Sequence, residues 1–251
     1  MGDQASVVLC HGFTSSPATL GYWADGLRAG GCRVAVPRLP GHDTTWQQLN
    51  RTGWQDWYAR VERELLDLHS VLGRPIFVGG LSMGGALALR LAQRHPQLVA
   101  GLLLVNPCVL LDDPRLRLLP VLRRVRASIP GIASDIAKPG VAEFAYDRTP
   151  LHALASSLEL FADAERRLSA VTAPVIVFRS PQDHVVPPRS AERVLTGVSS
   201  RDVTDVKLPN SYHVATMDHD AALVVADSLA FIGRLNQTHS SASESHTRGA
   251  A

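Results

Sequence analysis

The segment Gly80-Leu81-Ser82-Met83-Gly84 places a serine between two glycines. The apolar run Pro75–Val78 precedes it, and the Ala- and Leu-rich segment Met83–His95 follows it. A sharp turn from a strand into a helix strains the backbone of its central residue, and glycines on both sides remove side chains that would clash. We therefore predict that Ser82 is a nucleophile held at the carboxyl edge of a sheet. The alternative is that Ser82 only caps the following helix.

A serine hydroxyl reacts readily only when a base accepts its proton and a carboxylate orients that base. His213 follows the strand-like run Val203–Leu208, and Asp183 follows the run Pro174–Ser180. The loops that follow parallel strands gather at one edge of a sheet, where ligands bind and catalysis occurs. We predict that His213 is the base and that Asp183 is its partner.

Two other arrangements use neighbouring residues. Asp112 and Asp113 also follow an apolar run and could supply the acid in place of Asp183. A metal site is a further alternative, because ligand side chains cluster in one short segment: His213, Asp218, His219 and Asp220. No His-x-x-x-His spacing supports the metal site, and a triad accounts better for His213. We expect neither a metal nor a cofactor.

A serine hydrolase also needs two fixed N–H groups directed at the oxyanion that forms during the reaction. The first is predicted to be the backbone N–H of Met83, the residue after the nucleophile. The second is predicted to be the backbone N–H of Phe13, in the loop His11-Gly12-Phe13-Thr14 after the first apolar run. We expect His11 to hold this loop through hydrogen bonds rather than to take part in catalysis.

Short apolar runs without polar alternation recur along the chain, as is typical of strands buried on both faces. They are Ser6–Cys10, Cys32–Val36, Pro75–Val78, Gly101–Val105, Pro174–Ser180 and Val203–Leu208. Helix-like segments lie between or after them, at Trp54–Val71, Met83–His95, Ala191–Thr196 and Ala221–Leu235. This alternation predicts an α/β fold with a mostly parallel sheet flanked by helices.

The interval between the fourth and fifth runs is far longer than a simple crossover requires. We predict a small helical cap at residues 108–160, inserted after the fourth visible strand, on a core formed by residues 1–107 and 161–235. Residues 236–251 lack apolar periodicity and are predicted to be a disordered tail. An apolar stripe with helical spacing runs through the start of the cap: Leu118, Leu122, Val125 and Ile129. It either packs on the core or, with five arginines nearby, meets an anionic membrane surface.

The composition of the 251 residues limits the class of protein. Hydrophobic residues make up 45% and charged residues 19%, which is typical of a folded globular chain and excludes general disorder. The net charge of +2 does not support nucleic-acid binding. No stretch approaches the ~20 apolar residues of a membrane span. Three scattered cysteines and the absence of an export signal predict a cytoplasmic location, peripheral to a membrane if the cap meets lipid.

Four motifs together resemble those of the α/β-hydrolase fold, and more narrowly those of bacterial monoacylglycerol lipases and related carboxylesterases. They are His11-Gly12-Phe13, Gly80-Leu81-Ser82-Met83-Gly84-Gly85, Asp183-His184-Val185-Val186-Pro187-Pro188 and the segment from Asn210 to Asp218. The resemblance extends from about Ser6 to Ile232. It implies Ser82 as nucleophile, His213 as base and Asp183 as its partner, with backbone donors at Phe13 and Met83.

The resemblance also implies a substrate, a small-molecule lipid ester. The activity it implies is hydrolysis of monoacylglycerols to glycerol and a fatty acid through an acyl-enzyme. By this resemblance Glu143 accepts a glycerol hydroxyl, Ile132 lines the acyl site and Asn106 makes a further polar contact. Glu143 could instead be a solvated charge on a helix. The alternative functions are a general short- to medium-chain carboxylesterase and a non-catalytic ligand-binding protein on the same fold.

Overall fold

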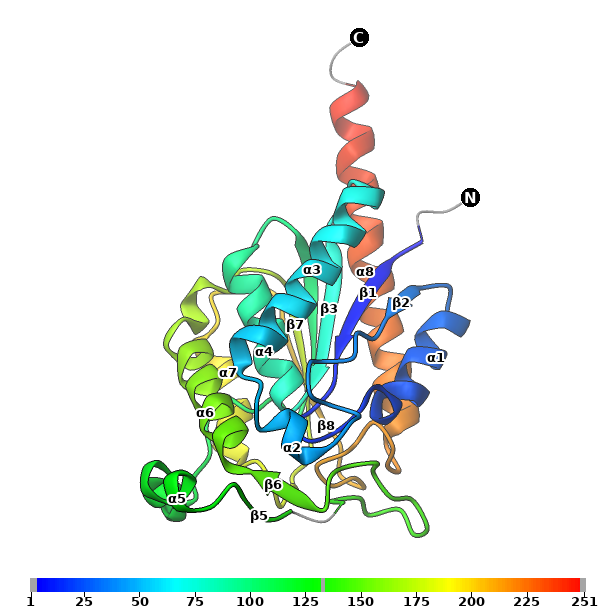
Figure 1. Ribbon diagram of the computed structural model, residues 1–251. Coiled ribbons are helices and arrows are strands. Elements are labelled where there is room, and N and C mark those ends of the chain that lie inside the picture. Colours follow the sequence, from blue (N-terminus) through cyan, green and yellow to red (C-terminus); the bar gives the residue numbers. More distant parts are fainter. Residues whose placement is uncertain (1–3, 132–133, 249–251) are drawn as a thin grey trace.

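The computed structural model describes residues 4–131 and 134–248. Within them the main sheet has six strands in the order β2-β1-β3-β4-β7-β8, and every neighbouring pair is parallel (Figure 1). The strands are β1 (Ser6–Cys10), β2 (Arg33–Ala35), β3 (Ile76–Leu81), β4 (Val99–Val105), β7 (Val175–Arg179) and β8 (Val203–Lys207). Each overlaps one of the six apolar runs, so the predicted mostly parallel sheet is confirmed.

Helices cover both faces of this sheet, and the strands supply apolar side chains to each face in turn. One face carries α1 (Gly21–Ala29) and α8 (Ala221–Arg248), while the other carries α3 (Trp54–Leu72), α4 (Met83–Arg94), α6 (Leu151–Arg166) and α7 (Pro188–Gly197). Successive residues of a strand point to opposite faces. Val7 and Leu9 therefore pack in the cluster of α1 and α8, whereas Val8 and Cys10 pack in the cluster of α3 and α4.

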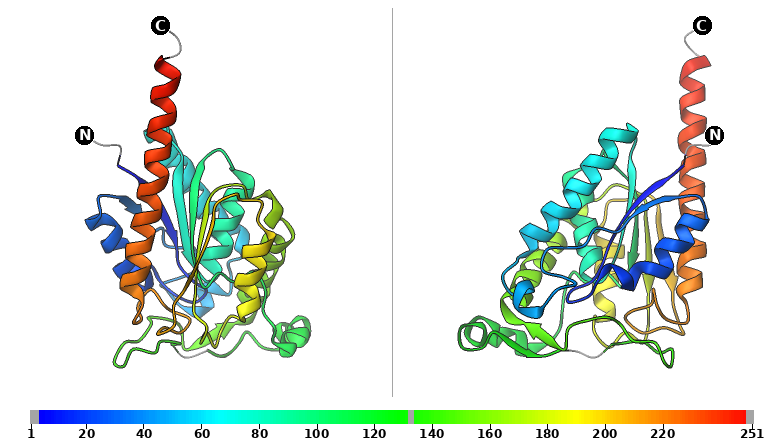
Figure 2. Two further views of the ribbon diagram at one scale, coloured as in Figure 1. Left: turned by 180° about the vertical axis from the view of Figure 1, so that it is seen from behind. Right: turned by 45° about the vertical axis from the view of Figure 1, so that its right-hand side comes forward.

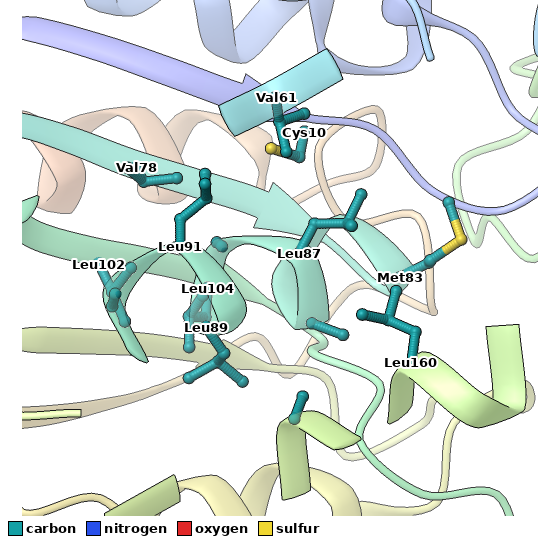
Figure 3. Packing of buried hydrophobic residues seen from close by; sticks show 14 of the residues in the cluster. Cys10, Val61, Val78, Met83, Leu87, Leu89, Leu91, Leu102, Leu104 and Leu160 are labelled. Carbon is teal, nitrogen blue, oxygen red and sulfur yellow. The ribbon is translucent and has the colours of Figure 1, made fainter. Parts of the chain in front are cut away.

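The larger core cluster fixes α4, the helix that follows the predicted nucleophile. Figure 3 shows Leu91 of α4 beside Val78 of β3 and Leu87 farther along the same helix, and Leu102 and Leu104 of β4 belong to the same cluster. All five side chains are fully buried. Burial of a leucine side chain contributes about 2 kcal/mol to stability, so these contacts hold α4 firmly against the sheet.

The segment after β4, predicted to be a small helical cap, contains both helical and extended elements. Residues 108–150, called the insertion below, contain η2 (Pro114–Leu118), α5 (Leu119–Val125) and an antiparallel pair of short strands, β5 (Ser128–Pro130) and β6 (Arg148–Pro150). Figures 1 and 2 show these elements beyond the carboxyl ends of the sheet strands, at the end of the molecule opposite both chain termini. The insertion therefore lies over the sheet edge at which the predicted site residues gather.

The predicted boundary of the insertion at residue 160 falls inside α6, which packs against α3 and α4. Ala153, Leu160, Phe161 and Ala164 of α6 are buried in the larger core cluster, so this helix belongs to the layer that flanks the sheet. Short helical elements also occur at η1 (Pro17–Leu20), α2 (Trp46–Leu49) and η3 (Leu168–Ala170).

The end of the chain also differs from expectation. The tail predicted to be disordered from residue 236 continues α8, which runs to Arg248. No Pro or Gly lies between residues 234 and 248, so nothing in the backbone chemistry of this stretch stops the helix. In the described part of the chain, no helix combines the length and apolarity needed to span a bilayer.

Candidate active site

Ser82 lies between β3 and α4 in a backbone conformation that L-amino acids rarely adopt, with φ 56° and ψ −117°. The glycines around it are required by close approach. A Cβ on Gly84 would lie 1.9 Å from the carbonyl oxygen of Cys10, and one on Gly80 would lie 2.2 Å from the carbonyl carbon of Gly84. The start of α4 therefore lies directly against β1 and β3. This packing holds the partly exposed Ser82 at the carboxyl edge of the sheet.

The structure brings His213 and Asp183 together, although they come from loops after different strands. The Nδ1 atom of His213 lies 2.7 Å from Oδ2 of Asp183. The other carboxylate oxygen, Oδ1, accepts hydrogen bonds from the backbone N–H groups of Val185 and Val186, at 2.8 and 2.7 Å. Both side chains of the pair are less than 10% exposed. The carboxylate is thus fixed in orientation, and it holds the proton of the imidazole on Nδ1, leaving Nε2 as an acceptor.

The charges around His213 favour its protonated form. Burial lowers the pKa of His213, but the hydrogen bond and charge of Asp183, with the charges of Glu143 and Asp135, raise that pKa above the ordinary value of an imidazole. A positive imidazolium is therefore stabilised at this place. That is the state a base reaches after it has taken a proton from a serine.

The alternative acids lie elsewhere. Asp112 pairs with Arg189 and Asp113 pairs with Arg115, in both cases at the exposed surface. Neither carboxylate is bonded to His213, whose partner is Asp183. Among the described residues no group of His, Cys, Asp and Glu side chains has the arrangement of a metal site.

The loop after β1 lies beside Ser82, as the oxyanion prediction requires. A Cβ on Gly12 would lie 3.8 Å from the Cβ of Ser82, which is an ordinary contact distance. Phe13 follows in this loop. Met83 is the first residue of α4, so its N–H has no partner within the helix and lies at the positive end of the helix dipole. Both backbone donors stay predictions.

His11 holds the same loop. Its Nε2 accepts a hydrogen bond from the N–H of Leu39 at 3.2 Å, so the proton is on Nδ1, which donates to the carbonyl of Gly12 at 3.1 Å. Burial, against smaller opposing effects of Gly12 and Asp43, lowers the pKa of His11 to about 4. The ring is therefore neutral near pH 7 and serves as a structural link, in agreement with the expectation for it.

Glu143 is not a solvated helix charge. Residues 141–146 carry no regular secondary structure. Burial raises the pKa of Glu143 above its ordinary value, while a hydrogen bond with Ser15 and the nearby His213 oppose that rise. Glu143 therefore interacts with Ser15 in the loop after β1 and lies near enough to His213 for their charges to interact. Ile132, the predicted acyl contact, lies outside the described residues.

The role of Asn106 as a substrate contact stays a prediction, and the structure shows what its side chain contacts within the protein. Asn106 follows β4 with φ 42° and is only 3% exposed. Its Oδ1 accepts the N–H of Ser180 at 2.8 Å, and its Nδ2 donates to the carbonyl oxygen of His213 at 2.8 Å. The amide is thus engaged within the protein, where it joins the ends of β4 and β7 to the loop that carries His213.

Two carboxylates at the site bind backbone N–H groups of neighbouring segments, a role that the sequence did not predict for either residue. Asp135 of the insertion accepts the backbone N–H groups of His184 and His213 at 3.1 and 3.0 Å. Asp218 accepts backbone N–H groups on both the insertion and the His213 loop. The sequence shows both acids, but their bonding partners are main-chain groups that no side-chain pattern reveals.

Comparisons with known proteins agree with this architecture. A thermostable monoacylglycerol lipase of Bacillus sp. strain H-257 is 37% identical over 91% of this chain and 90% of its own length. A carboxylesterase of Bacillus subtilis strain 168 is 27% identical over 94% of each chain. A solved structure reported for LipS and LipT, two metagenome-derived lipolytic enzymes, is 38% identical and superimposes with a TM-score of 0.89, covering 93% of this chain and 95% of its own.

The parallel sheet, the helices on its two faces and the serine on a strained turn after β3 are those of an α/β-hydrolase. The family model described as serine aminopeptidase, S33, matches residues 2–220. The chain belongs to this family.

Proposed function

We propose that this protein is a serine esterase that hydrolyses monoacylglycerols to glycerol and a fatty acid, with Ser82, His213 and Asp183 as its catalytic triad. The main support is the contact of 2.7 Å between His213 and Asp183 at the sheet edge where Ser82 stands on its strained turn. The similarity to a monoacylglycerol lipase over nine-tenths of the chain supports the substrate.

The reaction begins with the hydroxyl of Ser82. Its oxygen attacks the ester carbonyl carbon while Nε2 of His213 accepts the hydroxyl proton. Asp183 keeps the imidazole in the tautomer that can accept this proton, and it stabilises the resulting imidazolium. The N–H groups of Phe13 and Met83 bind the oxyanion, and the start of α4 adds its dipole to that stabilisation.

The intermediate collapses when His213 gives its proton to the leaving alcohol, and the acyl group remains on Ser82. A water molecule then repeats the sequence, with His213 again as base, and the fatty acid leaves. The products carry the atoms of one ester and one water. No cofactor takes part in either half of the reaction.

Glycerol is the proposed alcohol because Glu143 offers a polar group beside the triad. It lies in the insertion near Ser15 and His213, and its backbone N–H is bonded to Oγ of Ser134 at 2.7 Å. A carboxylate held in this way can accept a hydroxyl of the substrate, whereas an acyl chain needs apolar surroundings. We propose that the insertion, residues 108–150, serves as the cap that supplies the substrate pocket, and that the acyl chain is of medium or long length.

A substrate panel tests the proposal. Mono-, di- and triacylglycerols are compared with short aryl and methyl esters, using wild-type protein and Ser82→Ala. The proposal predicts the highest kcat/KM for monoacylglycerols and no turnover by Ser82→Ala. Glu143→Ala is expected to reduce monoacylglycerol turnover much more than aryl ester turnover. Preference for short methyl esters favours the carboxylesterase alternative, and activity retained by Ser82→Ala contradicts the triad.

The surface of the insertion supports weak contact with an anionic membrane. Leu118, Val121 and Val125 are each at least 65% exposed, and they follow one another at helical spacing. These three side chains lie on one side of a short helical segment and form an exposed apolar face, whose contact with water is unfavourable. Five arginines between residues 115 and 126 surround this face with positive charge, which anionic headgroups complement.

Vesicle sedimentation tests the membrane contact. Wild-type protein is expected to sediment with phosphatidylglycerol vesicles at low salt, less at high salt and little with phosphatidylcholine vesicles. Val125→Asp is expected to weaken this binding. Val71→Asp is the matched control, because Val71 is equally exposed but lies at the end of α3, away from the insertion. Equal binding by both variants, or no binding to anionic vesicles, contradicts the proposal.

A further inference from the structure

The loops that carry Asp183 and His213 are joined by a third segment, which belongs to the insertion. Asp135 places both carboxylate oxygens on these loops. Its Oδ2 accepts the N–H of His213 at 3.0 Å and the N–H of His184 at 3.1 Å. Its Oδ1 lies 2.8 Å from Nδ1 of His184. One side chain thus connects the residue next to Asp183 with His213 itself.

A second carboxylate makes the connection in the opposite direction, from the His213 loop to the insertion. Asp218, in the His213 loop, accepts the N–H groups of Ala137 and Lys138 in the insertion, at 2.7 and 2.9 Å. It also accepts the N–H groups of Tyr212 and His219 of its own loop, at 2.9 and 2.8 Å. Asp135 and Asp218, called the carboxylate clamp below, therefore fasten the insertion to the base-carrying loop from both sides.

The two carboxylates of the clamp are largely buried, so they depend on their hydrogen bonds to backbone N–H groups. The Asp135 side chain is 12% exposed, and Asp218 is 2% exposed. A carboxylate in such surroundings is stable only when several donors satisfy it, and hydrogen bonds to a charged acceptor are about twice as strong as neutral ones. Burial raises the pKa of Asp218, but its four backbone donors outweigh this and hold that pKa below the ordinary value. It is therefore ionised near pH 7.

The two peptide groups around His213 are held by different parts of the fold. Its carbonyl oxygen accepts from Asn106, which follows β4. Its N–H donates to Asp135, which lies in the insertion, and the carbonyl of Asp135 accepts the N–H of Val214 at 3.1 Å. The sheet alone therefore supplies only one side of this support. The other side is present only while residues 135–138 are docked at the sheet edge.

We propose that Asp135 is a positioning residue for the catalytic base: its carboxylate holds the Asp183 and His213 loops in register, so that the insertion completes the triad as well as covering it. This inference rests on the proposed serine esterase function. The imidazole must stand within hydrogen-bonding distance of Ser82, and a displacement of about 1 Å can reduce a rate by about 100-fold. A contact to the backbone of the base itself controls that distance directly.

Kinetics on a short aryl ester provide the main test, because such a substrate does not need the glycerol pocket. Asp135→Ala is expected to lower kcat by about 10- to 100-fold with little change in KM. The loss is expected to be the same for aryl esters and monoacylglycerols, since it arises at His213. Asp147→Ala, at an exposed carboxylate in the same insertion, is the matched control and is expected to leave both constants unchanged.

The pH profile separates positioning from a general structural role. The charged groups that face His213 are Asp183 from the loop after β7 and Glu143 and Asp135 from the insertion. Asp135→Asn keeps the size of the side chain and one acceptor oxygen but removes one of these negative charges. The acidic limb of kcat/KM is therefore expected to move to lower pH. If Asp135→Ala does not fold, this variant decides the question alone.

A measurement without turnover keeps the inference separate from the proposed function. The proton on Nδ1 of His213, bonded to Asp183, gives a far-downfield NMR signal, which is expected to be sharp in wild-type protein and broadened or shifted in Asp135→Ala. An unchanged signal in folded Asp135→Ala overturns the inference, as does unchanged kcat with an unmoved acidic limb. An inactive wild-type protein whose signal still depends on Asp135 overturns the proposed function and leaves the positioning role supported.

Discussion

Replacing Asp183 with Asn changes one atom of the triad, and the surroundings dictate how the new side chain is oriented. Oδ1 of Asp183 accepts two backbone N–H groups, from Val185 and Val186. An amide NH₂ cannot occupy that place, because it would face two donors. The Asn carbonyl must therefore take the position of Oδ1, and its NH₂ must face Nδ1 of His213.

This orientation forces the wrong tautomer on the base. An NH₂ at 2.7 Å, the distance now occupied by Asp183 Oδ2, requires His213 Nδ1 to accept a hydrogen bond. The imidazole proton then moves to Nε2, which can no longer accept the proton of Ser82. Loss of the base in its reactive tautomer lowers kcat by about 10⁴-fold, equivalent to about 5 kcal/mol in the activation free energy.

The assay is steady-state hydrolysis of a soluble aryl ester near pH 7, with thermal unfolding measured on the same samples. Asp183→Asn is expected to remain folded and to lose about four orders of magnitude in kcat. Asp112→Asn is the control, because Asp112 is exposed and pairs with Arg189, and it is expected to retain wild-type kcat. A loss below about tenfold in Asp183→Asn, or a comparable loss in Asp112→Asn, would refute the tautomer argument.

Changes of pH and a substitution at Gly84 test other features of the site. Burial lowers the pKa of His213, but Asp183 chiefly raises it above the ordinary imidazole value of about 6.5. The acidic limb of kcat/KM is therefore expected to have its midpoint above that value. A midpoint below about 6.5 contradicts the view that nearby carboxylates outweigh burial at His213. By linkage, the stability from this pair is complete below about pH 6.5 and is lost as pH rises through the folded pKa. Gly84→Ala is expected to lower both melting temperature and activity, because the new Cβ would lie 1.9 Å from the Cys10 carbonyl oxygen. Gly21→Ala, where nothing lies within 4 Å and φ is −55°, controls for loss of glycine, and equal effects of the two would show that close approach is not the cause.

The sheet could be predicted because its central strands are short, continuous apolar runs, and burial on both faces requires that composition. The helices α3, α4 and α7 also agree in position with the predicted segments. By contrast, α6 was divided by the predicted end of the insertion. Its buried face includes Ala153, Ser157 and Ala164, whose small side chains give a weak apolar signal.

The candidate site likewise has one part that the sequence predicts and another part that it does not. The residues of the proposed triad lie in the turns and loops that follow strands, and parallel strands bring those segments to one edge, so their proximity follows from chain order and fold. The supporting contacts of Asp135 and Asn106 with the backbone of His213 do not follow, because they join residues 78 and 107 positions apart in the chain. A sequence shows that these residues are polar but not which main-chain donors they meet.

Labelling of the nucleophile tests the central claim most directly. Wild-type protein, Ser82→Ala and His213→Ala are incubated with a fluorophosphonate probe near neutral pH, and the modified peptide is identified by mass spectrometry. The account predicts a single rapid modification at Ser82, absent in Ser82→Ala and strongly slowed in His213→Ala. Modification at another residue, or labelling of Ser82 at the same rate without His213, would contradict it.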